Sequence, residues 1–165
     1  EKAVQLLPYD YSSRNNLGIV YGRHNEPEKA LKELTTAILL RPDDDSMKIN
    51  LSVHYLKVKE HKKAEEILKY LLSKNPRDAR LHYRLGLIYD DAGKYEEAIS
   101  ELLRSMELAP DVIDIYEALG NIFASRLKDL EKAEYYYVKG IEAAPQSKSR
   151  IEDLRWMIQD LEAHR

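Results

Sequence analysis

The sequence predicts an all-α chain in which four helix pairs stack into an α-α superhelix that is closed by a C-terminal capping helix. Prolines at positions 8, 42, 76 and 110 lie 34 residues apart, and Pro145 follows 35 residues later. Leucines at positions 17, 51, 85 and 119 keep the 34-residue period throughout. Periods of about 20–50 residues are typical of solenoids, which stack one supersecondary unit many times. The period therefore predicts a stack of equivalent units.

Each period divides into two helical stretches. In the third period, His82, Leu85 and Tyr89 lie three and four residues apart, which places them on one face of a helix. Gly93 interrupts this pattern before a second stretch begins. Pro110 ends the second stretch, because proline cannot continue a helix and restricts the residue before it. The repeated unit is therefore a pair of helices.

Aspartates stand just before the first helix of each pair. Asp10, Asp44 and Asp78 occupy equivalent positions, and each can accept a hydrogen bond from a free backbone N–H of the first turn. The fourth equivalent is Val112, and we expect Asp111 to replace it as the N-cap.

Small residues recur where two helices of a pair are expected to cross. The first set follows the periodic leucine and consists of Gly18, Ser52, Gly86 and Gly120. The second set is Ala30, Ala64, Ala98 and Ala133. A bulky side chain in either set would push the pair apart at a cost of roughly 1–3 kcal/mol. Ala133 comes one residue late, which predicts a single insertion in the turn at 125–130.

This pattern resembles the tetratricopeptide repeat (TPR). The family signature of Leu-Gly, an aromatic residue, Ala, a large apolar residue and Pro is met by Leu85-Gly86, Tyr89, Ala98, Leu102 and Pro110. It is met again by Leu17-Gly18, Tyr21, Ala30, Leu34 and Pro42. The second repeat departs from it at Ser52 and the fourth departs by its insertion. The resemblance covers nearly the whole chain.

The repeat pattern divides the chain into six parts. Residues 1–10 are expected to be the tail of a preceding TPR helix, so that the chain is a fragment of a larger TPR protein. Four repeats are expected at 11–44, 45–78, 79–112 and 113–147. Residues 148–165 are expected to form the capping helix that solenoids require, with Ser149 and Glu152 as a capping box. Its apolar stripe comprises Ile151, Leu154, Met157, Ile158 and Leu161, and Trp156 lies off this stripe.

Composition argues against several functional classes. The chain has no cysteine, which excludes disulfides and thiolate zinc sites, and its histidines show no metal-binding spacing. We expect no catalytic residues, no cofactor and no metal. The net charge of −3 gives no pull towards nucleic acid, and no apolar run is long enough to span a membrane. A soluble chain is expected, with a cytoplasmic location favoured over export.

The TPR resemblance implies a concave groove, lined by the first helices of successive repeats, that holds a peptide or a partner helix. The candidate groove residues are those that the core pattern leaves free on these helices. They are Asn15, Asn16, Ile19, Ile49, Asn50, Val53, Arg80, Tyr83, Arg84, Leu87, Glu117 and Asn121. The apolar members would let a partner bury apolar surface there at about 25 cal/mol per Å².

Two interpretations of the polar groove residues remain open. Some TPR domains clamp the C-terminal carboxylate of heat-shock chaperones, and Asn50, Arg80 and Arg84 resemble part of that clamp. The hydrogen-bond donors that this clamp takes from its first repeat are missing, because Asn15 and Ile19 stand where Lys and Asn are expected. Alternatively, the two arginines pair with acids of the next repeat. These would be Asp114 and Glu117, in surface ion pairs worth about 0–1 kcal/mol each.

The function expected from the resemblance is that of a scaffold that binds a protein or peptide. One alternative is a non-catalytic arm that presents substrate to a larger enzyme, such as a TPR-bearing glycosyltransferase. Another is self-assembly through the N-terminal stub at 1–10.

Overall fold

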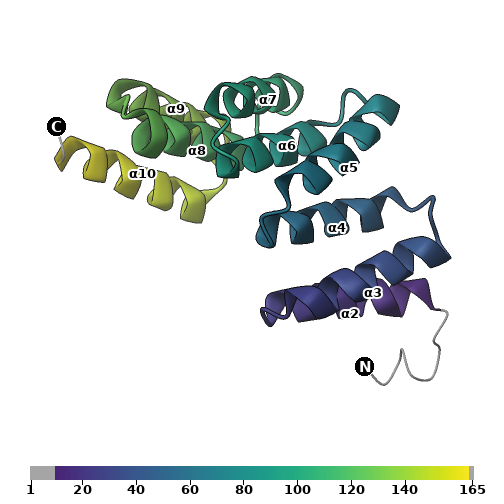
Figure 1. The fold of residues 1–165 in the computed structure, drawn as a ribbon. Coiled ribbons are helices and arrows are strands. Elements are labelled where there is room, and N and C mark those ends of the chain that lie inside the picture. Colours follow the sequence, from purple (N-terminus) through teal and green to yellow (C-terminus); the bar gives the residue numbers. More distant parts are fainter. Residues whose placement is uncertain (1–9, 164–165) are drawn as a thin grey trace. The chain divides into compact units, whose positions relative to one another are not determined.

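The computed structural model describes residues 10–163, and within this range every regular element is a helix (Figure 1). The chain divides into two compact units, 1–74 and 75–165. The all-α fold class is confirmed. The expected tail of a preceding helix at 1–10, and self-association through it, lie outside the described residues except for Asp10.

The N-terminal unit contains two helix pairs. The first pair is α2 (Tyr11–Arg23) with α3 (Pro27–Leu40), and the second is α4 (Asp45–Lys57) with α5 (His61–Lys74). The core alanines Ala30 and Ala64 are fully buried, and Ser52 is 1% exposed. Burial at these positions agrees with the close crossings that the sequence predicts.

The C-terminal unit contains two further pairs and a last helix. The first pair is α6 (Ala79–Asp91) with α7 (Tyr95–Leu108). The second comprises α8 (Ile113–Asn121), which continues as the π-helical segment η1 (Ile122–Leu127), and α9 (Leu130–Ala143). The last helix, α10 (Lys148–Ala163), packs against α9.

Close approach within a pair depends on the small residue after the periodic leucine. A Cβ atom at Gly86 would stand 2.7 Å from Leu102 Cγ and 3.2 Å from the carbonyl oxygen of Ala98. At Gly18 it would stand 2.7 Å from Leu34 Cγ. Distances this short require the partner side chain or backbone to move.

The N-cap predictions are right in three repeats and wrong in the fourth. Asp10, Asp44 and Asp78 each accept at least one hydrogen bond from a backbone N–H of the first turn. In the fourth repeat the N-cap is Val112, which has no side-chain cap, so Asp111 does not replace the missing aspartate.

The predicted capping box at Ser149 and Glu152 is also wrong. Helix α10 begins at Lys148, and its first backbone bond runs from Ile151 N to Ser147 O at 3.0 Å. Ser149 therefore lies inside the first turn, where it cannot act as the N-cap.

The residue inserted in the fourth repeat is accommodated mainly within the π-helical segment η1. In the third repeat the chain leaves α6 through Gly93, and Lys94 N bonds Tyr89 O at 2.8 Å. In the fourth, Asp129 N bonds Phe123 O at 2.9 Å, one residue further back. A π-helix takes one more residue per hydrogen-bonded turn than an α-helix, so it absorbs the extra residue.

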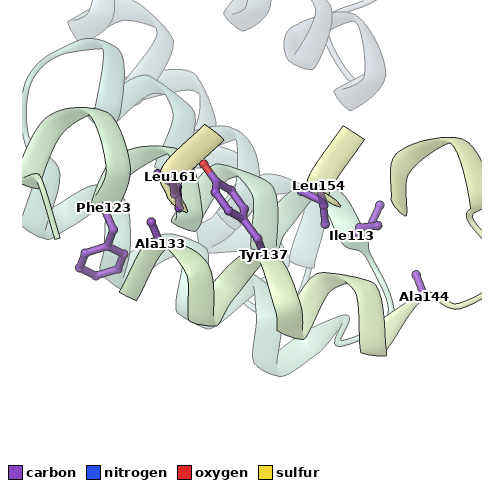
Figure 2. Packing of buried hydrophobic residues seen from close by; sticks show 7 residues of the cluster. All are labelled: Ile113, Phe123, Ala133, Tyr137, Ala144, Leu154 and Leu161. Atoms are coloured by element: carbon purple, nitrogen blue, oxygen red, sulfur yellow. The ribbon is translucent and has the colours of Figure 1, made fainter. Parts of the chain in front are cut away.

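The hydrophobic core of the last repeat joins α8, η1, α9 and α10. Figure 2 shows Leu154 and Leu161 of α10 facing α9, which carries Ala133 and Tyr137. Of the predicted α10 stripe, Leu154 and Leu161 are buried, and Ile151, Met157 and Ile158 pack against the cluster. Trp156 is 65% exposed, as its position off the stripe predicts.

The turns inside the helix pairs supply a testable prediction. Each contains one residue with positive φ, namely Asn25, Lys59, Gly93 or Lys128. A left-handed backbone costs about 1–2 kcal/mol in a residue with a side chain and little in glycine. We expect Lys128→Gly to raise the free energy of unfolding by about 1 kcal/mol and Gly93→Ala to lower it by about 1 kcal/mol. Urea unfolding followed by circular dichroism measures both, and two changes of the same sign would contradict the backbone explanation.

Candidate groove in the C-terminal unit

One pocket in the C-terminal unit brings together four of the predicted groove residues. It has a volume of about 240 Å³ and lies between α6, the α8–η1 helix and the start of α10. Its lining contains the predicted residues Tyr83, Leu87, Glu117 and Asn121. The remaining lining residues are Asp90, Asp114, Ala118, Ile122 and Arg150.

Arg150 dominates the polar contacts of this pocket. It extends from the first turn of α10, and its Nη2 donates hydrogen bonds to carboxylate oxygens of Asp114 and Glu117 on α8. Its Nη1 lies 3.6 Å from Asp153 Oδ2 on its own helix. At the other end of the pocket, Arg126 Nε donates to Asp90 Oδ1 at 3.2 Å.

Burial and charge shift the pKa values of several pocket groups. Burial raises the pKa of Glu117, and Asp114 and Asp153 add to this effect, whereas Arg150 opposes it. Burial also raises the pKa of Tyr83, with contributions from Asp114 and Glu117, so its hydroxyl is protonated at neutral pH. The pocket therefore contains a partly desolvated carboxylate beside a neutral phenol.

The predicted pairing of Arg80 with Asp114 and Glu117 is wrong. Arg80 Nη2 lies 2.9 Å from Asp78 Oδ2, so it pairs with the N-cap of its own helix. Asp114 and Glu117 pair with Arg150 instead. Arg80, Tyr83 and Arg84 line a second pocket of about 190 Å³ between α6 and the start of α8. Its other walls are Ala79, Ser105, Ala109, Val112 and Ile115.

Two of the predicted groove residues of the N-terminal unit, Asn15 and Asn50, are hydrogen-bonded to each other. Asn50 Nδ2 donates to Asn15 Oδ1 at 3.1 Å, which joins α4 to α2. Ile19, Ile49 and Val53 are half-buried, and Asn16 is exposed. Asn50, one of the residues that resemble the carboxylate clamp, therefore already holds an amide partner.

A buried histidine fills the adjacent position between α2 and α4. His54 is 5% exposed, and a Cβ atom at Gly22 would stand 1.6 Å from its Cε1. Its Nδ1 has no hydrogen-bond partner among residues 10–163. Burial, with a smaller effect of Lys57, lowers the pKa of His54, so the ring is neutral at neutral pH. His54 is thus a packing residue of this unit.

Comparison with protein families settles the classification. Two tetratricopeptide-repeat models match residues 55–122 and 113–147, which together cover more than half of the chain. The chain belongs to the tetratricopeptide-repeat family. No curated protein sequence matches this TPR chain.

Solved structures show the same fold. A crystal structure of MamA superposes with a TM-score of 0.71 at 22% identity, over 90% of this chain and 86% of that one. MamA from Desulfovibrio magneticus RS-1, from residue 41 to its end, gives a TM-score of 0.73 at 24% identity, over 87% and 81%. At these identities the likeness shows the fold alone.

Five lining residues are not among the twelve predicted groove residues, and they are Arg150, Asp90, Asp114, Ala118 and Ile122. Arg150 lies on α10, for which the sequence pattern predicts a capping role and no groove residue. A signal was present, because α10 begins 35 residues after α8, the same step that separates Pro110 from Pro145. This spacing puts α10 in register with the first helices of the repeats, so its first turn was a candidate neighbour of α8.

Between 10 and 163, no group of histidine and carboxylate side chains is arranged to hold a metal ion. None of the described helices has the length and apolar character needed to cross a membrane. The TPR repeats support a protein-interaction or scaffold module.

Proposed function

We propose that this TPR chain binds an extended peptide or a partner helix against α6 and α8. The observation that supports the proposal is the 240 Å³ pocket, because four side chains chosen from the repeat pattern line it together. Its walls combine apolar side chains with Asn121 and four charged residues, so a partner could make both apolar and polar contacts there. Such a pocket would accept one or two anchoring side chains of a partner.

The proposal includes the division of the chain. It takes residues 11–44, 45–78, 79–112 and 113–147 as four repeats and 148–165 as the capping helix. In support, first helices begin at Tyr11, Asp45, Ala79 and Ile113, steps of 34 residues.

Selection of peptides tests the site. Random dodecapeptides displayed on phage are selected against the purified chain, and the dissociation constants of the synthesised binders are measured by fluorescence polarisation. Ala118→Gln places a larger neutral side chain in the pocket. We expect it to weaken binding about tenfold or more, because filling the pocket removes the partner's anchor.

Thr35→Gln is the matched control, since Thr35 is exposed on α3. It should leave the dissociation constants unchanged. A selection that yields no binders, or only binders that Ala118→Gln does not affect, contradicts the proposed site.

A further inference from the structure

The charges around the 240 Å³ pocket do not balance. Three lining carboxylates, those of Asp90, Asp114 and Glu117, face one lining guanidinium, that of Arg150. Adding the contacting partners Arg126 and Asp153 gives four carboxylates and two guanidiniums, a net charge of −2. Arg84, whose charge also acts on Tyr83, brings the balance to −1, so an excess of negative charge remains at this place.

Glu117 is the group most affected by this excess. Its side chain is 19% exposed, against 51% for Asp114, so water solvates it least. Its pKa is raised by burial and by the acids beside it, in spite of Arg150. An additional cation would lower the free energy of its ionised form.

The rest of the wall suits a long side chain. Leu87, Ala118 and Ile122 supply apolar surface, and Tyr83 supplies an aromatic ring beside the acids. Lys and Arg carry an apolar stem that ends in a charged head, and this combination matches such a wall. At about 240 Å³ the pocket is smaller than the roughly 300–1,000 Å³ of small-molecule sites, which favours a side chain as its occupant.

The opening is specific to this part of the chain. Two 34-residue periods earlier, the positions of Asp90 and Ile122 are occupied by Gly22 and His54, and the histidine ring fills the space next to the glycine. An open acidic pocket is therefore a property of these residues and not of the repeat as such.

We propose that the pocket between α6 and α8 binds the basic side chain, Lys or Arg, of a partner polypeptide. Arg150 occupies part of the acidic wall from within the chain and competes with that side chain. The inference rests on the proposed function and adds the chemistry of the partner.

The selected dodecapeptides test the inference directly. Their sequences should be enriched in Lys and Arg relative to the unselected library. Glu117→Gln should weaken their binding about tenfold, because it removes the least solvated carboxylate. Arg150→Gln should tighten binding about fivefold, because it removes the internal competitor.

Opposite shifts from two neutral substitutions distinguish charge recognition from structural damage, which would weaken binding in both variants. Glu142→Gln, on an exposed carboxylate of α9, is the matched control and should change nothing. If Glu117→Gln lowers the helix content, Asp114→Asn repeats the test at a more exposed carboxylate.

The outcomes separate the two proposals. Peptides that are weakened by Ala118→Gln but lack basic enrichment, or are indifferent to both carboxylate variants, overturn the inference and leave the proposed function standing. Weaker binding in Arg150→Gln also overturns it. The absence of any peptide sensitive to Ala118→Gln overturns the proposed function itself.

Discussion

Replacing Gly22 with alanine is expected to lower the free energy of unfolding of the N-terminal unit by about 3 kcal/mol. The new Cβ atom would stand 1.6 Å from His54 Cε1, a separation that two non-bonded atoms cannot adopt. Either the buried ring leaves its site or α2 and α4 move apart, and both changes expose apolar surface. Urea unfolding followed by circular dichroism measures the loss, and hydrogen exchange assigns it to residues 10–74.

A double-mutant cycle identifies the ring as the cause. In a His54→Ala background the obstructing atoms are gone, and alanine is a better helix former than glycine by about 0.5–1 kcal/mol. Gly22→Ala should then be neutral or stabilising, although it is strongly destabilising in the parent chain. An equal loss in both backgrounds would show that the crossing of α2 and α4 does not depend on this contact.

Replacing Leu154 with alanine should lower the stability of the C-terminal unit by about 3 kcal/mol. Leu154 is fully buried, and its Cδ1 lies 3.0 Å from the place of a Cβ at Gly140 on α9. Helix α10 ends its unit and packs mainly on α9. The packing lost in Leu154→Ala should therefore release α10 before the rest of the unit unfolds.

The chain's single tryptophan reports this event, because Trp156 lies on α10. We expect the tryptophan fluorescence transition of Leu154→Ala to precede the circular dichroism transition. Glu152→Ala, at an exposed position of the same helix, is the control and should stay within about 0.5 kcal/mol of the parent. A Leu154→Ala protein as stable as this control would mean that α10 does not contribute to the core.

The predicted groove residues separate into those that share the C-terminal pocket and those that do not. Tyr83, Leu87, Glu117 and Asn121 were found from the repeat pattern because each takes a groove-facing position on a first helix. Arg150 is not among the predicted residues, because a capping role for 148–165 predicts no side chain in the groove. The clamp-like Asn50 and Arg80 instead bond neighbouring groups, Asn15 and Asp78.

The sequence by itself determined the helices, their pairing and the N-caps Asp10, Asp44 and Asp78. These features depend on local spacing, such as an aspartate two residues before a backbone N–H or an apolar residue every three or four positions. The recurrence of Ala98 opposite Gly86 also sufficed to predict a close crossing, because a periodic small residue has few other uses in a helix pair.

Only the tertiary structure decided which charges pair, where the inserted residue goes and which inter-helix space stays open. Sequence spacing does not choose between Arg80 and Arg150 as the partner of Glu117, because the packed positions of α6, α8 and α10 decide which guanidinium reaches it. The insertion enters η1, and Phe123 of this segment packs in the core of the last repeat. The ring of His54 closes the space beside Gly22, whereas Ile122 at the equivalent position leaves a pocket beside Asp90, because side-chain volume acts only once the helices are in place.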